Sequence, residues 1–213
     1  MPLYADILLV RHGESEANAA GRLAYRTWDP PLTEAGAFQA ERLAKQLITA
    51  PVRYIVTSPL LRAQQTVEPL AHIHHIQPII LDDLSEVDLG TWDGRRLKDL
   101  ESDNLPDFRA WRQDPEANPP PGGENIVAVG ERVLSALSAF LKTCQPASLT
   151  VGATHADCIK GAILVVLKAH GPASRHISVP NAGQLLLRYF DTGRWVLIFS
   201  PLCHAGEEDQ DLD

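Results

Sequence analysis

Residues 7–14 read Ile7-Leu8-Leu9-Val10-Arg11-His12-Gly13-Glu14. The four apolar residues are typical of a buried strand, and the strand leads an arginine and a histidine into a glycine turn. The Arg11 guanidinium offers a planar, permanently charged fork to phosphate oxygens, and the His12 imidazole is a nitrogen nucleophile that can accept a phosphoryl group. Gly13 lets the backbone and an anion approach each other closely. The stretch therefore predicts a phosphate site at the end of a buried strand.

Strands and helices alternate along most of the chain. Short apolar runs predict strands at residues 7–10, 54–57 and 149–153, and helical patterns cover about 34–48, 60–71, 131–141 and 155–168. This alternation predicts an α/β fold, a three-layer α/β/α sandwich around a mostly parallel central sheet. Residues 185–190 and 195–199 are separated by Asp191-Thr192-Gly193, which predicts a late hairpin and one antiparallel edge strand.

Charged side chains follow all three predicted strands. Arg62 lies one helical turn beyond the strand at 54–57, and His155 comes directly after the strand at 149–153. Because ligands of such sheets bind beyond the carboxyl ends of the strands, Arg11, His12, Arg62 and His155 are expected to surround one anion. Glu86 is our candidate proton donor, since burial in a capped pocket raises the pKa of a carboxyl group.

The chain is predicted to form a single catalytic domain over residues 1–202. Residues 82–125 are rich in Pro, Asp and Trp and end in Pro119-Pro120-Pro121-Gly122-Gly123, which favours a small lid over the carboxyl ends of the strands. The net charge is −8, but five acidic residues crowd the last seven positions and leave −3 on the rest. Residues 203–213 are therefore expected to be a disordered acidic tail.

Composition excludes several other classes of protein. The 213 residues are 45% hydrophobic and 22% charged, as is ordinary for a soluble globular domain. The three cysteines are widely spaced and predict no disulfide framework, and no basic stripe indicates a nucleic-acid partner. The longest apolar helical stretch, 159–167, is far too short to span a membrane, and the N-terminus lacks a signal-peptide layout. We expect a cytoplasmic protein.

Five segments carry a resemblance to a known family. They are residues 9–18, 31–36, 57–66, 86–94 and 154–157, in the family's order. On these segments the chain resembles the histidine phosphatase superfamily, the phosphoglycerate-mutase-like group. The resemblance implies that His12 is the phosphorylated nucleophile and that Glu86 is the proton donor. It also implies that phosphate is bound by four further side chains: Arg11, Asn18, Arg62 and His155.

The implied activity is that of a metal-independent phosphomonoesterase acting on a small phosphorylated metabolite through a phosphohistidine, with no cofactor and no metal ion. The family's usual Ser-His-Gly is replaced by Thr154-His155-Ala156. The amide of Ala156 is still expected to contact phosphate, although the added methyl group makes the approach tighter. The role of Asp157 is left open: a carboxylate beside a phosphate pocket repels the ligand unless it pairs with an arginine, and an orienting role behind such an arginine is one alternative.

Two alternatives remain at this point. The first is phosphoryl transfer of the cofactor-dependent phosphoglycerate mutase type. Such mutases tend to have a longer capping insertion and a Gly-Leu-Asn-Lys type stretch, whereas this chain has Gly-Thr-Trp-Asp-Gly-Arg-Arg at 90–96, and its residues 120–125 resemble the phosphatase branch. The second is a non-catalytic phosphate-binding module, which would need no acid such as Glu86. The substrate and a possible homodimer are left open.

Overall fold

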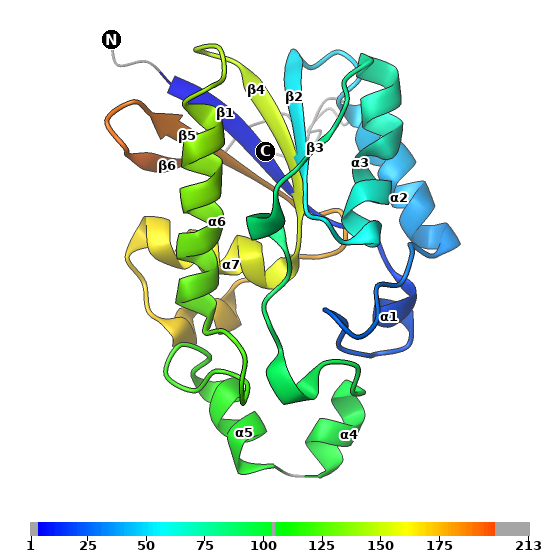
Figure 1. The fold of residues 1–213 in the computed structure, drawn as a ribbon, viewed down its shortest axis with the longest axis vertical. Coiled ribbons are helices and arrows are strands. Elements are labelled where there is room, and N and C mark those ends of the chain that lie inside the picture. Colours follow the sequence, from blue (N-terminus) through cyan, green and yellow to red (C-terminus); the bar gives the residue numbers. More distant parts are fainter. Residues whose placement is uncertain (1–3, 104, 199–213) are drawn as a thin grey trace, which may run out of the picture.

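The computed structural model describes residues 4–103 and 105–198, with a six-stranded sheet at the centre (Figure 1). In sheet order the strands are β3 (Ile79–Ile80), β2 (Val52–Thr57), β4 (Leu149–Thr154), β1 (Tyr4–Arg11), β5 (Gln184–Phe190) and β6 (Trp195–Ile198). The first four pair in parallel, β5 is antiparallel to β1, and β6 is antiparallel to β5. The predicted α/β fold with a mostly parallel sheet is confirmed.

The predicted late hairpin is also present, with one difference in detail. The antiparallel strand β5 lies one place in from the edge, because β6 pairs with its far side. Phe199, at the end of the predicted hairpin, and the predicted tail at 203–213 lie outside the described residues.

Helices cover both faces of the sheet. The long ones are α2 (Glu34–Gln46), α3 (Leu61–His74), α6 (Ile126–Leu141) and α7 (Ala156–Leu167). Leu8 and Val10 of β1 pack with α2 and α3, whereas Ile7 and Leu9 pack with α6 and α7. Figure 1 shows these pairs on opposite sides of the strands. Because β1 is buried on both faces, its sequence is a continuous apolar run rather than an alternating one.

Local capping explains where two of these helices begin. The Thr33 side chain accepts a hydrogen bond from the Gly36 amide at the start of α2, and the Asn125 side chain accepts one from the Ala128 amide at the start of α6. The predicted start of α6 at residue 131 was wrong by five residues, because the first turn after the Asn125 cap is apolar and buried. Residues such as Asn and Thr satisfy amides that have no partner within a helix.

Helices α6 and α7 cross closely at a pair of glycines. A Cβ atom on Gly130 would lie 2.2 Å from the carbonyl oxygen of Gly161, so neither position tolerates a side chain without movement of a helix. This contact fixes α7, which begins directly after His155. The end of β4 and the N-terminus of α7 are thereby held in one place.

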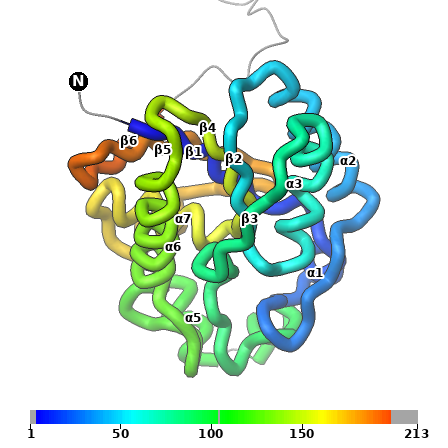
Figure 2. The backbone as a smooth tube through the Cα atoms, turned by 45° about the horizontal axis from the view of Figure 1, so that its top comes forward, coloured from blue at the N-terminus to red at the C-terminus, as the bar shows by residue number. Residues whose placement is uncertain are grey.

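Residues 82–125, which we call the lid segment, contain four short helices. These are η1 (Asp82–Leu84), η2 (Gly90–Trp92), α4 (Leu97–Ser102) and α5 (Pro106–Gln113). Figures 1 and 2 both place α5 beyond the end of the sheet at which β1 leads into α1 (Glu16–Ala19). The segment has a small core of its own around Trp92, Leu100 and Phe108. Within the described ranges, no helix is both long and apolar enough to cross a membrane.

Candidate active site

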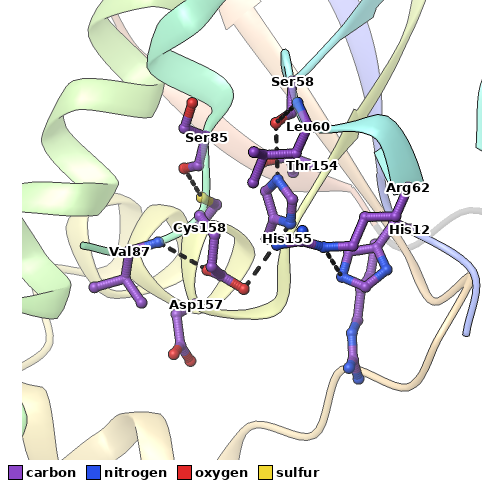
Figure 3. A network of polar contacts seen from close by, with 12 residues as sticks. His12, Ser58, Leu60, Arg62, Ser85, Val87, Thr154, His155, Asp157 and Cys158 are labelled. Atoms are coloured by element: carbon purple, nitrogen blue, oxygen red, sulfur yellow. Dashed lines mark hydrogen bonds and ion pairs between the residues drawn. The ribbon is translucent and has the colours of Figure 1, made fainter. Parts of the chain in front are cut away.

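The predicted site residues meet at one end of the sheet. Arg11, His12, Asn18, Arg62 and Glu86 all line a cavity of about 170 Å³, which we call the inner cavity. The ring centroids of His12 and His155 are 5.1 Å apart, and Figure 3 shows the two imidazoles beside Arg62. Three strand ends and the lid segment thus contribute to one small site.

Hydrogen bonds assign the tautomer of His12. Its Nδ1 lies 2.7 Å from the carbonyl oxygen of Gly13, which can only accept, so Nδ1 carries the proton. Its Nε2 accepts a hydrogen bond of 3.2 Å from Nε of Arg62 and is therefore the unprotonated nitrogen of the ring. Burial, followed by the charge of Arg62, lowers the pKa of His12 to about 3. The imidazole is neutral at ordinary pH, which is the state a nitrogen nucleophile needs.

Two arginines and the second histidine have nitrogens without a hydrogen-bond partner. In the described part of the chain, the buried side-chain nitrogens of this kind are Arg11 Nε, Arg62 Nη1 and His155 Nδ1. Arg62 Nη1 also forms an ion pair of 3.6 Å with Asp29. The other donors of the two guanidiniums are used for positioning, since Arg11 donates to the Val179 carbonyl at 2.7 Å and Arg62 to the Ala24 carbonyl at 3.0 Å. Buried donors without partners are rare and call for a specific explanation. An anion bound at this site would supply acceptors for such donors.

The second histidine is fully buried at the start of α7. Its Nε2 lies 2.8 Å from the hydroxyl of Ser58, which itself accepts from the Leu60 amide (Figure 3). Burial and the charge of Arg62 lower the pKa of His155 well below the ordinary value. If the Ser58 hydroxyl donates to Nε2, then Nδ1 of His155 carries a proton and can donate to a ligand.

Glu86 faces His155 from the lid segment. Its Oε2 lies 4.0 Å from His155 Nδ1, and its Oε1 accepts from the Val87 amide at 2.9 Å. Burial, reinforced by the nearby charge of Asp157, raises the pKa of Glu86 to about 7. A carboxyl group with this pKa can give up and take back a proton near neutral pH, which suits a general acid and base.

The backbone before Glu86 is tied to the core of the domain. Thr154 donates to the carbonyl of Leu84 at 2.8 Å, and the Cys158 thiol donates to the carbonyl of Ser85 at 2.9 Å. Arg132 of α6 reaches the Asp83 and Ser85 carbonyls. Cys158 thus has a structural role, and burial raises the pKa of its thiol. Strand β4 and helices α6 and α7 together determine where the carboxyl group lies.

The turn after His12 is held against α2 and α3. The Gly13 amide donates to the Thr66 hydroxyl at 2.9 Å, and that hydroxyl donates to the Arg62 carbonyl at 2.7 Å. A Cβ atom on Gly13 would lie 2.7 Å from the Gly36 carbonyl oxygen. The structure therefore supplies a reason for glycine here that the sequence did not suggest, namely contact with α2.

Three further residues that the sequence analysis discussed are Asn18, Ala156 and Asp157, and the structure shows the contacts of each. Asn18 is exposed, and its Oδ1 accepts from the Ser15 amide and hydroxyl and from Asn181. Ala156 begins α7 but does not line the inner cavity. Asp157, whose role the sequence left open, pairs with Lys160 at 3.1 Å and not with an arginine, because the i+3 spacing on α7 brings the two side chains together.

Sequence reasoning missed several supporting residues. Ser58 and Thr66 fall within the matched segment 57–66 but were given no role there. Asn181, whose side chain donates to the His12 carbonyl at 3.1 Å, was missed entirely. Its only signal is a turn-like Pro180-Asn181-Ala182-Gly183 stretch before β5. Trp111 lines the inner cavity from α5, and nothing in the sequence separated it from the other lid tryptophans.

No group of three or more His, Cys, Asp or Glu side chains suited to a metal ion occurs in the portion of the chain that the structure describes. His72 and His75 line a separate cavity of about 740 Å³ beside α3 and β3, which contains none of the predicted site residues. The positive charge in the inner cavity is supplied by arginine side chains.

The model of the histidine phosphatase superfamily (branch 1) matches residues 7–200. The chain therefore belongs to this superfamily. It is 28% identical to phosphoserine phosphatase 1 of Hydrogenobacter thermophilus over 201 residues, covering 94% of each chain. It is 31% identical to the probable phosphoglycerate mutase GpmB of Cronobacter sakazakii over 180 residues, covering 83% of this chain and 81% of that one.

Solved structures agree with this placement. The native structure of a mycobacterial glucosyl-3-phosphoglycerate phosphatase superposes with a TM-score of 0.79 at 25% sequence identity, covering 91% of this chain and 97% of that chain. The similarity extends over most of the chain. The family and the fold that the motifs indicated are confirmed.

Proposed function

We propose that this protein is a metal-independent phosphomonoesterase that hydrolyses a small phosphorylated metabolite through a phosphohistidine on His12. The observation that carries the proposal is the cluster of buried nitrogens without hydrogen-bond partners on Arg11, Arg62 and His155, together with the unprotonated Nε2 of His12. A phosphoryl group is an anion with three oxygens to satisfy and a phosphorus atom open to in-line attack. A site with one neutral nucleophile and several fixed donors matches that group.

In the first half of the reaction, Nε2 of His12 forms a bond to phosphorus while the bond from phosphorus to the substrate oxygen breaks. Arg62 gives up its hydrogen bond to Nε2 and donates to phosphoryl oxygens, together with Arg11 and His155. Protonated Glu86 gives its proton to the departing oxygen, so the product leaves as a neutral alcohol. The Nδ1 proton of His12 stays on the ring, where the Gly13 carbonyl stabilises the positive charge that develops.

In the second half, the Glu86 carboxylate takes a proton from a water molecule. The water oxygen bonds to phosphorus, the phosphorus–nitrogen bond breaks, and inorganic phosphate leaves. His12 recovers its lone pair and Glu86 its proton. The first-turn amides of α7, which no side chain caps, can also donate to phosphate, and we assign the Ala156 amide to this role. We assign Asn18, which lines the inner cavity, to phosphate binding through its side chain.

Hydrolysis is favoured over mutase activity, but the mutase remains the second candidate. Phosphoserine phosphatase 1 and the glucosyl-3-phosphoglycerate phosphatase are named as hydrolases, and the family model covers this chain almost completely. The similarity to GpmB, named as a probable phosphoglycerate mutase, supports the alternative. The two activities differ in whether water or the bound product receives the phosphoryl group.

The test is to trap the phosphorylated enzyme with a substrate labelled in its phosphoryl group. We expect label on the unmodified protein when turnover is stopped in alkaline detergent, and loss of that label in acid, because a phosphorus–nitrogen bond survives base but not acid. His12→Ala should carry no label above background. His72→Ala, which removes an exposed histidine of α3, should be labelled like the unmodified protein.

The fate of the label separates the two activities. A phosphatase releases it as inorganic phosphate, whereas a mutase moves it between positions 2 and 3 of phosphoglycerate. Equal labelling of His12→Ala and the unmodified protein would refute the proposed nucleophile. Label that is recovered in rearranged phosphoglycerate, with little inorganic phosphate, would establish the mutase instead.

A further inference from the structure

A second and larger cavity adjoins the inner one. It has a volume of about 630 Å³, and we call it the outer cavity. Arg11, Val87, Trp111 and Asp157 line both cavities, whereas His12 lines only the inner one. A leaving group departs from phosphorus on the side opposite the nucleophile, and the outer cavity, which His12 does not line, offers room for the remainder of a substrate.

The outer cavity brings together cations from distant parts of the chain. Arg112 comes from α5 in the lid segment, Arg175 from η3 (Gly171–His176), and Lys160 from α7. With Arg11 they give four permanent positive charges, against two carboxylates, Glu124 and Asp157. A net positive cavity is notable in a chain whose overall charge is −8, and it favours an anionic ligand.

Both carboxylates of the outer cavity are already paired. Asp157 binds Lys160 at 3.1 Å, and Glu124 binds Arg132 through two contacts of 3.1 and 2.9 Å. Neither Arg112 nor Arg175 forms an ion pair within residues 4–103 and 105–198.

The two guanidiniums line the same cavity and act on each other electrostatically. Burial, followed by the charge of Arg112, lowers the pKa of Arg175, and the charge of Asp157 opposes this effect. Like charges on the wall of one cavity repel each other, and an anion bound there reduces that repulsion.

The position of Arg175 is held by the lid segment. Its Nη2 donates to the Trp111 carbonyl at 3.0 Å, and its guanidinium lies 5.2 Å from the centre of the Trp111 ring. Trp111 reaches the inner cavity as well. One aromatic side chain thus connects the place where phosphate would bind with the arginine that faces the outer cavity.

We propose that Arg112 and Arg175 select substrates whose leaving group carries an anion of its own, either a carboxylate or a second phosphate. This inference rests on the proposed phosphatase function and names the substrate class of that site. Guanidinium groups suit both anions because their paired donors match two oxygens. The inner cavity binds the phosphoryl group to be transferred, and the outer cavity binds the second anion.

The experiment compares substrates that differ only in the second anion. 3-Phosphoglycerate and glycerol 3-phosphate share a carbon skeleton and differ by a carboxylate against a hydroxymethyl group. Fructose 1,6-bisphosphate and fructose 6-phosphate differ by a second phosphate. We expect kcat/KM to be at least about tenfold higher for the charged member of one pair, given the usual strength of hydrogen bonds between charged groups. The pair that shows the preference identifies the anion.

Arg112→Gln and Arg175→Gln should each reduce kcat/KM for the preferred substrate by about tenfold to a hundredfold. The loss should appear mainly in KM, because these arginines lie away from the bond that breaks. Turnover of the uncharged member and of p-nitrophenyl phosphate should change less than about twofold by the same reasoning, which also shows that the variants are folded. Arg109→Gln removes the same charge from α5 at an exposed position that lines neither cavity, and it should leave the preference intact.

Each other result overturns a defined part of the reasoning. If the enzyme hydrolyses both members of both pairs equally, this inference is wrong while the phosphatase function stands. A preference that survives both substitutions shows that other residues select the anion. If no phosphomonoester is hydrolysed, the proposed function fails and this inference fails with it.

Discussion

Replacing Glu86 with Gln should stabilise the fold at alkaline pH while impairing catalysis. The pKa of Glu86 is raised from its ordinary 4.5 to about 7, chiefly by burial. Each pH unit between the two values corresponds to about 1.4 kcal/mol, so the ionised carboxylate costs the folded state on the order of 3 kcal/mol. Glutamine is uncharged at every pH and can still accept the hydrogen bond from Val87, so Glu86→Gln removes this cost.

The pH dependence follows from proton binding. Below pH 4.5 both the folded and the unfolded chain keep the Glu86 proton, and the residue contributes no difference. Between pH 4.5 and about 7 the unfolded chain loses this proton while the folded chain keeps it, so stability falls as pH rises. Above about pH 7 the folded chain has also lost the proton, and the decrease in stability has reached its full value. The advantage of the variant should therefore be small at pH 5 and reach its full value by about pH 8.5.

The measurement is urea unfolding of the unmodified protein and Glu86→Gln at pH 5 and pH 8.5. Taking the difference between the two proteins at each pH cancels the titration of all other groups that are unchanged. Glu41→Gln, an exposed substitution on α2, controls for the loss of one negative charge. A stability difference between the unmodified protein and Glu86→Gln that is the same at both pH values would refute the raised pKa, and with it the reason for choosing Glu86 as the acid.

Three further outcomes are expected. In single-turnover phosphorylation, Glu86→Gln should slow an alkyl phosphate by about 10²–10⁴-fold and an aryl phosphate far less, because a phenolate leaves without a proton; equal losses would indicate a structural role. Hydrolysis should persist in excess chelator, whereas activity that disappears and returns with magnesium would contradict the metal-independent mechanism. Gly36→Ala should lower the free energy of unfolding by about 2 kcal/mol or more and slow turnover, because its Cβ would lie 2.0 Å from the Glu14 carbonyl oxygen in the turn after His12. An unchanged urea midpoint and an unchanged rate would show that α2 can move away.

Most residues of the candidate site could be predicted from the sequence because they lie next to regular strands and helices. Arg11 and His12 follow an apolar run, and His155 follows another, so parallel strand order alone brings them to the same end of the sheet. Glu86 was harder, because no periodic pattern surrounds it. It was identified through the family resemblance and through the chemical need for an acid in a capped site.

The sequence by itself determined the α/β class, the superfamily and most of the side chains that meet at the inner cavity, because these depend on local apolar patterns and on short motifs. The tertiary structure decided two other matters. It gave Gly13 a neighbour in Gly36, and it placed Arg112 and Arg175 on the wall of one cavity. Each of these placements depends on how close two backbones lie or on how a helix is rotated about its axis. Packing across the whole core sets those quantities, and no short stretch of sequence encodes them.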